Sequence, residues 1–215
     1  MSSDDIFKKT RKEYERGALD ESSIDPHPIT QFRRWFDEAM QSEAGEVNAC
    51  ALSTVGSDGR PSGRMVLLKS LDEEGLVFFT NYDSKKGRQL SENPQAALLF
   101  YWPSLERQVR FEGECLRISS EESDSYFLSR PRSAQLGAVV SLQSSVAESR
   151  ATIDSSYVSL ESKMVERAIT RPSHWGGFRL APSLAEFWQG RESRLHDRIQ
   201  YEVVDGTWKR NRLWP

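Results

Sequence analysis

Apolar residues recur with a helical period near the start of the chain. Five large apolar side chains follow this repeat: Ile29, Phe32, Trp35, Phe36 and Met40. The repeat places them on one face, and Pro28 is compatible with a first helical turn. We therefore expect an amphipathic helix over 29–40. Residues 1–27 are charged without a sustained apolar period, so we expect a mobile N-terminal arm with one helical turn near Tyr14.

Short apolar runs between turn residues predict a series of strands. The runs cover 48–55, 64–70, 76–80, 96–101, 106–118, 184–189, 195–204 and 208–213. The run 96–101 is expected to be buried on both faces, the run 106–118 to be the longest strand, and Gly113 to mark a bulge. Residues 72–75 read as a tight turn, so the strands on either side of it should form a hairpin.

Capping residues predict where two helices begin. Ser84 precedes a predicted helix over 85–92, and Ser119 with Glu122 forms a capping box for a helix that ends near Pro131. Two more helices are expected over 133–142 and 153–168. Helices and strands do not alternate regularly, which argues against a parallel sheet. We expect an α+β fold in which a mainly antiparallel sheet curls into a barrel with flanking helices, as one domain over 28–215.

The composition is that of a globular protein. Of the 215 residues, 37% are hydrophobic and 28% are charged, unlike disordered chains. The longest apolar run is 96–102, whereas a membrane helix needs about 20 apolar residues. The N-terminus lacks the apolar core of a secretory signal. A cytoplasmic location without a membrane partner is therefore expected.

Charge and metal-ligand content narrow the chemistry further. A net charge of −3 gives no basic footprint for nucleic acid. Cys50 and Cys115 are expected to be buried thiols, and the three histidines include no His-x-x-x-His pair. No metal site is therefore expected.

Cationic side chains in structured segments indicate anion binding. Ser84, Lys85 and Lys86 at a helix N-terminus would offer hydroxyl, backbone and ammonium donors to a phosphate. Tyr126 and Arg130 lie four residues apart, so they would share one helix face and also suit a phosphate. The alternatives are a solvated charged turn and a surface arginine stacked on a tyrosine.

A third cationic group lies near the C-terminus. Arg194, His196 and Arg198 alternate along a predicted strand, so all three would project from one face. The group needs an anion or acidic neighbours, and pairing with local carboxylates is the alternative interpretation. Two anion sites without a metal suggest a phosphorylated cofactor and a phosphorylated substrate. Trp175 and Trp188 could each wall a planar ring or fill the core.

Ordered motifs cover nearly the whole chain, from about residue 11 to residue 215. They are Arg64-Met-Val-Leu-Leu-Lys69, Phe79-Thr80, Leu105-Glu-Arg-Gln-Val109, Ser129-Arg-Pro-Arg132, Gln143-Ser-Ser145, Trp175-Gly-Gly-Phe-Arg179 and Glu186-Phe-Trp-Gln-Gly190 followed by Arg194-Leu-His-Asp-Arg198. In order and spacing these motifs resemble the pyridoxine (pyridoxamine) 5′-phosphate oxidases. The last of them is the most specific.

The resemblance implies an FMN-binding split β-barrel that forms a homodimer, with one FMN per site between subunits. The implied FMN ligands are Arg64, Met65, Val66, Leu67, Leu68, Lys69, Phe79, Thr80, Lys85, Lys86, Gln108, Gln143, Ser144, Trp188 and Arg198. The implied substrate ligands are Lys69, Tyr126, Arg130, Ser133, Arg194 and His196, with Arg11 and Tyr14 of the arm closing over them. Arg194 and His196 are also the implied catalytic residues.

Two positions depart from the family pattern. Phe79 stands where the family often has tyrosine, which removes a hydroxyl group but keeps the ring. Ala134 stands where the family usually has a serine that contacts the substrate phosphate. Either Ser133 replaces that serine or the phosphate loses one neutral donor.

The implied activity is the oxidation of pyridoxine 5′-phosphate or pyridoxamine 5′-phosphate to pyridoxal 5′-phosphate in vitamin B6 metabolism. Hydride would pass from the substrate C4′ carbon to flavin N5, and O2 would then accept the electrons, giving H2O2 (and ammonia from the amine). Two alternatives are a related phenazine-pathway-type flavin oxidase and a non-catalytic flavin- or pyridoxal-phosphate-binding protein.

Overall fold

The computed structural model describes residues 14, 17–42 and 45–215. These residues form two compact units. The first unit contains the described residues up to Val47, together with Leu99–Phe111 and Ser183–Pro215. The second unit contains Asn48–Leu98 and Glu112–Pro182.

Helices and strands follow one another without a regular βαβ pattern, as the sequence predicts. The helices are α2 (Pro28–Gln41), α3 (Lys85–Glu92), α4 (Ser120–Ser129), α5 (Arg132–Val140) and α6 (Arg150–Lys163), with a short 3₁₀ turn η1 (Glu192–Arg194). The strands are β1 (Ala49–Val55), β2 (Pro61–Leu67), β3 (Ser70–Asp72), β4 (Gly75–Asn81), β5 (Gln95–Trp102), β6 (Arg107–Arg117), β7 (Trp175–Gln189), β8 (Asp197–Val204) and β9 (Thr207–Arg212). Strands β5, β6 and β7 contribute to both units.

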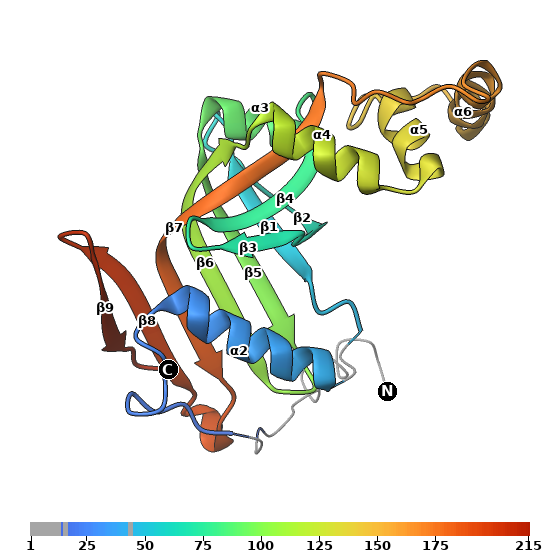
Figure 1. The fold of residues 1–215 in the computed structure, drawn as a ribbon. Coiled ribbons are helices and arrows are strands. Elements are labelled where there is room, and N and C mark those ends of the chain that lie inside the picture. Colours follow the sequence, from blue (N-terminus) through green and yellow to red (C-terminus); the bar gives the residue numbers. More distant parts are fainter. Residues whose placement is uncertain (1–13, 15–16, 43–44) are drawn as a thin grey trace, which may run out of the picture. The chain divides into compact units, whose positions relative to one another are not determined.

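An antiparallel sheet forms the frame of the second unit. Its strands follow the order β2-β1-β5-β6-β7-β4-β3 (Figure 1). Strand β1 pairs with β2, and β4 pairs with the first half of β7, both antiparallel. Strands β3 and β4 form the hairpin that the turn at 72–75 predicts. The expected mainly antiparallel α+β fold is confirmed.

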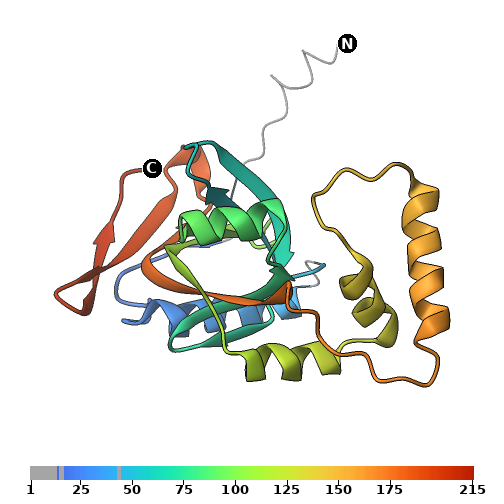
Figure 2. The same cartoon turned by 90° about the horizontal axis from the view of Figure 1, so that it is seen from above.

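The helices of the second unit begin where the capping residues predict. Ser84 Oγ accepts the N–H of Gly87 at the start of α3. Ser119 and Glu122 form both hydrogen bonds of a capping box at the start of α4. Helices α5 and α6 lie together beyond α4 (Figure 2), and none of the residues of α6 is buried.

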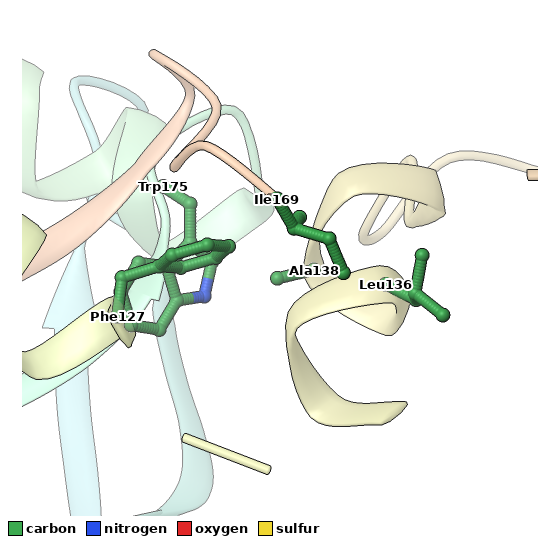
Figure 3. Close-up of a cluster of buried hydrophobic side chains, with 5 residues drawn as sticks. All are labelled: Phe127, Leu136, Ala138, Ile169 and Trp175. Carbon is green, nitrogen blue, oxygen red and sulfur yellow. The ribbon is translucent and has the colours of Figure 1, made fainter. Parts of the chain in front are cut away.

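A small apolar cluster joins α4, α5 and the start of β7 (Figure 3). Its buried members are Phe127, Leu136, Ala138, Ile169 and Trp175. The rings of Phe127 and Trp175 meet edge to face, with 5.4 Å between centroids. The cluster therefore fixes the end of α4 against the first residue of β7.

An aromatic core holds the first unit together. Helix α2 lies along the ends of β5 and β6 (Figure 1), where Phe32 packs on Phe100 with centroids 4.8 Å apart. Trp35 of the same helix contacts Phe187 of β7 at 5.2 Å. The helix predicted over 29–40 is confirmed: Ile29, Phe32 and Trp35 of the predicted face are buried, whereas Met40 is 60% exposed. Strands β8 and β9 form an antiparallel hairpin that extends from β7.

Three strand predictions are wrong in detail. Strand β5 is not buried on both faces, because its side chains alternate and Tyr101 is 52% exposed. Gly113 lies inside the continuous strand β6, where a Cβ would come within 2.0 Å of the Ala181 carbonyl oxygen. This glycine permits a close approach of β7 and does not mark a bulge. The strand predicted over 64–70 ends at Leu67, and Ser70 begins β3.

The prediction that 106–118 forms the longest strand is also wrong, because β6 has 11 residues and β7 has 15. Strand β7 begins nine positions before the predicted start at residue 184. Gly176 and Gly177 break the apolar pattern there and hide the strand. A Cβ at Gly176 would lie 2.1 Å from the Tyr82 hydroxyl oxygen, and one at Gly177 would lie 2.4 Å from Ile118. The glycines leave room for these neighbours to pack on the strand.

Both cysteines are buried and free, as expected. Burial raises the pKa of Cys50 and of Cys115 to about 12, so both thiols are inert. Within the described ranges, no helix combines the length and the apolar character needed to cross a membrane.

Candidate active site

A cavity of about 550 Å³ lies in the second unit. Residues of β2, β4, α3, α4 and α5 line it, together with Trp175 and Gln143. It brings together many of the residues that the resemblance implies: Met65, Val66, Leu67, Lys69, Phe79, Thr80, Lys86, Tyr126, Arg130 and Gln143. Their roles as ligands stay predictions.

Tyr126 and Arg130 meet in this cavity, but not for the reason that their spacing suggested. Tyr126 belongs to α4, whereas Arg130 is the residue that ends the helix, with extended backbone angles of −74° and 148°. The prediction that Tyr126 and Arg130 share one helix face is therefore wrong. Pro131 follows at once and disfavours helical geometry at Arg130.

Aromatic rings surround the side chain of Arg130. Its guanidinium lies 4.6 Å from the centroid of the Trp175 ring. Tyr126 stacks on Phe79, with 3.8 Å between centroids. Nη1 of Arg130 is buried and has no hydrogen-bond partner within residues 14, 17–42 and 45–215. A buried guanidinium nitrogen without an acceptor is suited to bind an anion.

Two further cations, Arg64 and Lys86, lie close together in the second unit. All their hydrogen-bond acceptors within the described residues are neutral: the carbonyl of Leu52 and the side chains of Thr54, Ser62, Thr80, Ser84, Gln89 and Gln143. Burial, together with the charge of Arg64, lowers the pKa of Lys86 to about 8. Two adjacent cations without a carboxylate form a site that an anion would stabilise.

The N-terminus of α3 contacts the loop that follows α5. The backbone N–H of Lys85 donates to Ser144 Oγ at 3.1 Å, and Lys86 Nζ donates to Gln143 Oε1 at 2.8 Å. The predicted ligands Lys85, Lys86, Gln143 and Ser144 therefore gather at one helix end. Such an end carries a partial positive charge that favours phosphate.

A second group of predicted ligands forms an aromatic cluster in the first unit. The rings of Trp188 and His196 lie 4.6 Å apart. Tyr14 packs edge-on against both, with 5.5 Å between centroids in each case. The predicted place of Tyr14 beside His196 is thus observed, whereas Arg11 lies outside the described residues.

His196 is held as a neutral imidazole. Its Nδ1 accepts the backbone N–H of Arg191 at 3.1 Å, so the ring proton must be on Nε2. Burial and the nearby charge of Arg194 lower the pKa of His196 below its ordinary value. At neutral pH this side chain can therefore donate a hydrogen bond from Nε2.

The strand face predicted for Arg194, His196 and Arg198 is wrong. Arg194 ends the 3₁₀ turn with a φ of 60°, next to Ser193 at 55°, and β8 begins only at Asp197. These two left-handed residues turn the chain before β8 starts. The alternation of charges therefore does not reflect a strand at Arg194 and His196. Such conformations are strained in residues other than glycine and are common at functional sites.

Arg198 pairs with a local carboxylate, which is the alternative to anion binding that the sequence left open. Glu186 is only 3% exposed and accepts Arg198 Nε at 2.7 Å and Arg110 Nη2 at 2.8 Å. Arg194, in contrast, has no hydrogen-bond or ion-pair partner within the described part of the chain. The sequence signal that could have found Glu186 is a lone carboxylate inside an apolar strand.

Three further predicted ligands, Leu68, Gln108 and Ser133, are not among the residues that line the cavity. Leu68 is buried beside β2, and Gln108 is half-buried in β6 of the first unit. Ser133 is exposed on α5, whereas Ala134 lines the cavity. The cavity wall therefore carries a methyl group where the family usually has a hydroxyl.

Two family models match this chain. The model described as pyridoxamine 5′-phosphate oxidase matches residues 36–163. The model described as the pyridoxine 5′-phosphate oxidase C-terminal dimerisation region matches residues 175–215.

Named relatives match over nearly the full length. The pyridoxine/pyridoxamine 5′-phosphate oxidase of Herminiimonas arsenicoxydans is 51% identical over 95% of this chain and 97% of its own. The protein of the same name from Rubrobacter xylanophilus is 53% identical over 95% of this chain and 94% of its own.

Solved structures share the fold. PhzG from Burkholderia lata, in complex with tetrahydrophenazine-1-carboxylic acid, has a TM-score of 0.87 at 32% identity, covering 92% of this chain and 98% of that one. A pyridoxamine 5′-phosphate oxidase-related, FMN-binding protein from Nostoc punctiforme has a TM-score of 0.69 at 19% identity, covering 88% of this chain and 98% of that one. The expected split-barrel fold class is confirmed.

Proposed function

Because this chain belongs to the pyridoxine/pyridoxamine 5′-phosphate oxidase family, we propose that it is an FMN-dependent oxidase of pyridoxine 5′-phosphate and pyridoxamine 5′-phosphate. The product is pyridoxal 5′-phosphate, with O2 as the electron acceptor. H2O2 forms with either substrate, and the amine also yields ammonia.

The proposal rests on two cationic sites in the second unit that have no acidic partner among the described residues. Arg64 with Lys86 forms the first, and Arg130 forms the second. Two such places suit two phosphate groups, one on a cofactor and one on a substrate. Charge-assisted bonds to phosphate are short and strong, so each group would be fixed in position.

The donors around Lys86 fit the phosphate of FMN. Arg64, Lys85 and Lys86 supply charge, and Thr80 and Ser144 supply hydroxyl groups. Residues 65–67 of β2 line the cavity beside them and would contact the flavin ring. When bound, FMN supplies the chemistry of the reaction by accepting a hydride from the substrate C4′ carbon and passing the electrons to O2.

Lys69, Tyr126 and Arg130 would hold the substrate phosphate. All three line the same cavity, and Nη1 of Arg130 has no hydrogen-bond partner among the described residues. Fixing the phosphate fixes the direction of the pyridine ring, and positioning is most of what the protein supplies to a hydride transfer.

Arg194 and His196 would contact the reacting end of the substrate. Arg194 brings a charge without a partner in the described part of the chain, and His196 donates from Nε2. A neutral, donating imidazole orients a substrate hydroxyl or amine and takes no proton from it. Trp188 and Tyr14 hold the ring of His196 in place.

A homodimer completes the proposed enzyme. The match of residues 175–215 to a dimerisation region supports it. FMN would lie between subunits, and Gln108, Trp188 and Arg198 would contact it. Their unit is the one that contains the dimerisation region. A cytoplasmic location is part of the same proposal.

The likeness to PhzG favours a second candidate, an oxidase of phenazine precursors. Lys69, Tyr126 and Arg130 weigh against it, because a substrate without a phosphate would leave two cations and a hydroxyl donor without a ligand. Identity to the named pyridoxine/pyridoxamine 5′-phosphate oxidases is also higher, at 51% against 32%.

Oxygen consumption by the FMN-loaded protein tests the proposal. Pyridoxine 5′-phosphate should cause O2 uptake with stoichiometric H2O2 and pyridoxal 5′-phosphate, whereas unphosphorylated pyridoxine should cause little. Absence of uptake with both phosphorylated substrates would point to a non-catalytic flavin- or pyridoxal-phosphate-binding protein. Uptake only with a phenazine precursor would establish the second candidate.

A further inference from the structure

The guanidinium of Arg130 is held by aromatic faces. It lies 4.6 Å from the centroid of Trp175 and 5.8 Å from that of Phe127. No carboxylate pairs with it in the described ranges, and its Nη1 is buried without an acceptor. Burial lowers the pKa of this arginine from its ordinary value. Within the described part of the chain, aromatic rings thus orient the cation, and its Nη1 is available to a ligand.

The backbone of Trp175 is fixed on both sides. Its backbone N–H donates to the Pro172 carbonyl at 3.0 Å, and its carbonyl accepts Arg171 Nη1 at 2.7 Å. Arg171 also forms an ion pair with Asp124 of α4, at 2.6 Å. The strand end that carries Trp175 is therefore tied to the helix whose end carries Arg130.

A parallel aromatic stack connects the two predicted phosphate ligands. Trp175 stacks on Phe79 with 5.4 Å between centroids and 14° between planes. Phe79 stacks on Tyr126 at 3.8 Å and 18°. Tyr126 and Trp175 also stack on each other, at 6.2 Å and 5°. The ring of Tyr126 and the indole face that holds Arg130 therefore belong to one group of parallel rings.

The backbone of Arg130 is fixed from its other side. Gln135 Nε2 donates to the carbonyl of Arg130 at 3.0 Å, and the N–H of Arg130 donates to the Phe127 carbonyl at 3.2 Å. Since the backbone is pinned, the remaining freedom lies in the long side chain. An arginine side chain without a partner has many rotamers, and a flat aromatic face removes most of them.

We infer that Trp175 is a positioning residue for substrate phosphate. Its indole face holds the Arg130 guanidinium in the orientation that presents Nη1 to the phosphate, so phosphate affinity depends on a side chain that need not touch the phosphate. The inference rests on the proposed function, since it requires a phosphorylated substrate in this cavity.

The test is a double-mutant cycle in the FMN-loaded enzyme, with pyridoxine 5′-phosphate as the substrate. Trp175→Leu removes the aromatic face and keeps the site apolar. The KM of this variant should rise about 3–30-fold, the range of one cation–π contact, while kcat stays within about twofold. Trp175→Phe keeps a smaller face and should raise KM less, and it serves as the working variant should the leucine variant not fold.

The background Arg130→Ala separates positioning from general loosening. In that background, Trp175→Leu or Trp175→Phe should raise KM little further, because the aromatic face no longer has a cation to hold. Ile169→Ala is the matched control, since it opens the same apolar cluster but keeps both rings that contact Arg130, and it should leave KM unchanged. Bound FMN, measured by its absorbance, should match wild type in every variant.

Three results would overturn the inference while leaving the proposed function intact. They are an unchanged KM in both tryptophan variants, a loss confined to kcat, and an equal further rise in KM in the Arg130→Ala background. A wild-type enzyme that does not oxidise pyridoxine 5′-phosphate would instead refute the proposed function itself.

Discussion

Several arginines of the first unit differ in their surroundings from the arginines at the cavity of the second unit. In the first unit, Arg110 and Arg198 share the buried carboxylate of Glu186, and Arg212 bonds Asp197 and Glu21. In the cavity of the second unit, Arg130 is without a carboxylate among the described residues, and so is Arg64 nearby. The same side chain thus serves as framework where it is paired and as a candidate ligand where it is not.

Arg194 differs from the paired arginines of the first unit. It has no hydrogen-bond or ion-pair partner within the described residues, and it lies on a strained turn beside His196. Its neighbour Arg191, in contrast, pairs with Asp197. An unpaired arginine next to a neutral imidazole points to a ligand contact.

The largest predicted effect is a loss of folding stability when the carboxylate is removed from a paired site. Glu186→Gln replaces the buried carboxylate that Arg110 and Arg198 share with a neutral amide. Breaking such a network should cost about 2–4 kcal/mol, discounted because both arginines are about one-third exposed. The melting temperature should fall by about 5–15 °C in a calorimetric scan. Glu202→Gln, an exposed substitution on β8, is the control. Equal melting temperatures for both variants would contradict the role of Glu186.

Removing an unpaired arginine should affect catalysis and spare the fold. Arg194→Ala should keep bound FMN and wild-type melting, and lose about 10–150-fold in kcat/KM for pyridoxine 5′-phosphate, the value of one charged hydrogen bond. His196→Asn should lose less, because an amide can replace the Nε2 donor. Wild-type kcat/KM in Arg194→Ala, measured under air, would show that this residue is not at the substrate.

The cation pair of the second unit should distinguish FMN from riboflavin. Lys86→Met should weaken FMN binding about 10–50-fold, since one charged contact is lost at a half-buried site. Riboflavin lacks the phosphate, so its affinity should not change. Arg60→Met, on the exposed β1–β2 turn, should alter neither. Fluorescence titration gives both constants, and a parallel loss for the two flavins would remove Lys86 from the phosphate site.

The smallest predicted effect is a pH dependence with opposite signs for binding and stability. The pKa of Lys86 is lowered to about 8 in the folded protein without flavin, from 10.5. FMN affinity should therefore decline above pH 8, where the ammonium loses its proton. Between pH 8 and 10.5 the unfolded chain binds more protons than the folded one, so this group makes the flavin-free protein more stable as pH rises.

Both trends should disappear in Lys86→Met. FMN titrations and urea unfolding at several pH values measure them. Binding and stability that change in the same direction in the wild type, or trends that persist in Lys86→Met, would assign the titration to another group.

Local signals in the sequence predicted the local structure well. Ser84 and the Ser119–Glu122 capping box set the starts of α3 and α4 correctly, because capping is decided within four residues. The apolar repeat from Ile29 to Met40 predicted α2 for the same reason. The start of β7 could not be predicted, because Gly176 and Gly177 serve neighbours that are distant in sequence.

The chemistry of the site was predicted more from motifs than from periodicity. The alternation of Arg194, His196 and Arg198 suggested a strand, yet two left-handed residues break it. The sequence could not show which arginines pair with carboxylates. Only the fold shows that Glu186 neutralises Arg198, whereas Nη1 of Arg130 has no hydrogen-bond partner among the described residues. That distinction separates framework arginines from candidate ligands.

The central claim is that this protein has two phosphate sites, one for the flavin and one for the substrate that reduces it. The most direct test is an anaerobic titration of the FMN-loaded protein, followed by the visible absorbance of the flavin. Pyridoxine 5′-phosphate should bleach the flavin at low concentration, admission of air should restore the colour, and pyridoxine should bleach it only at far higher concentration, if at all. Equal bleaching by pyridoxine, or none by its phosphate, would contradict the claim.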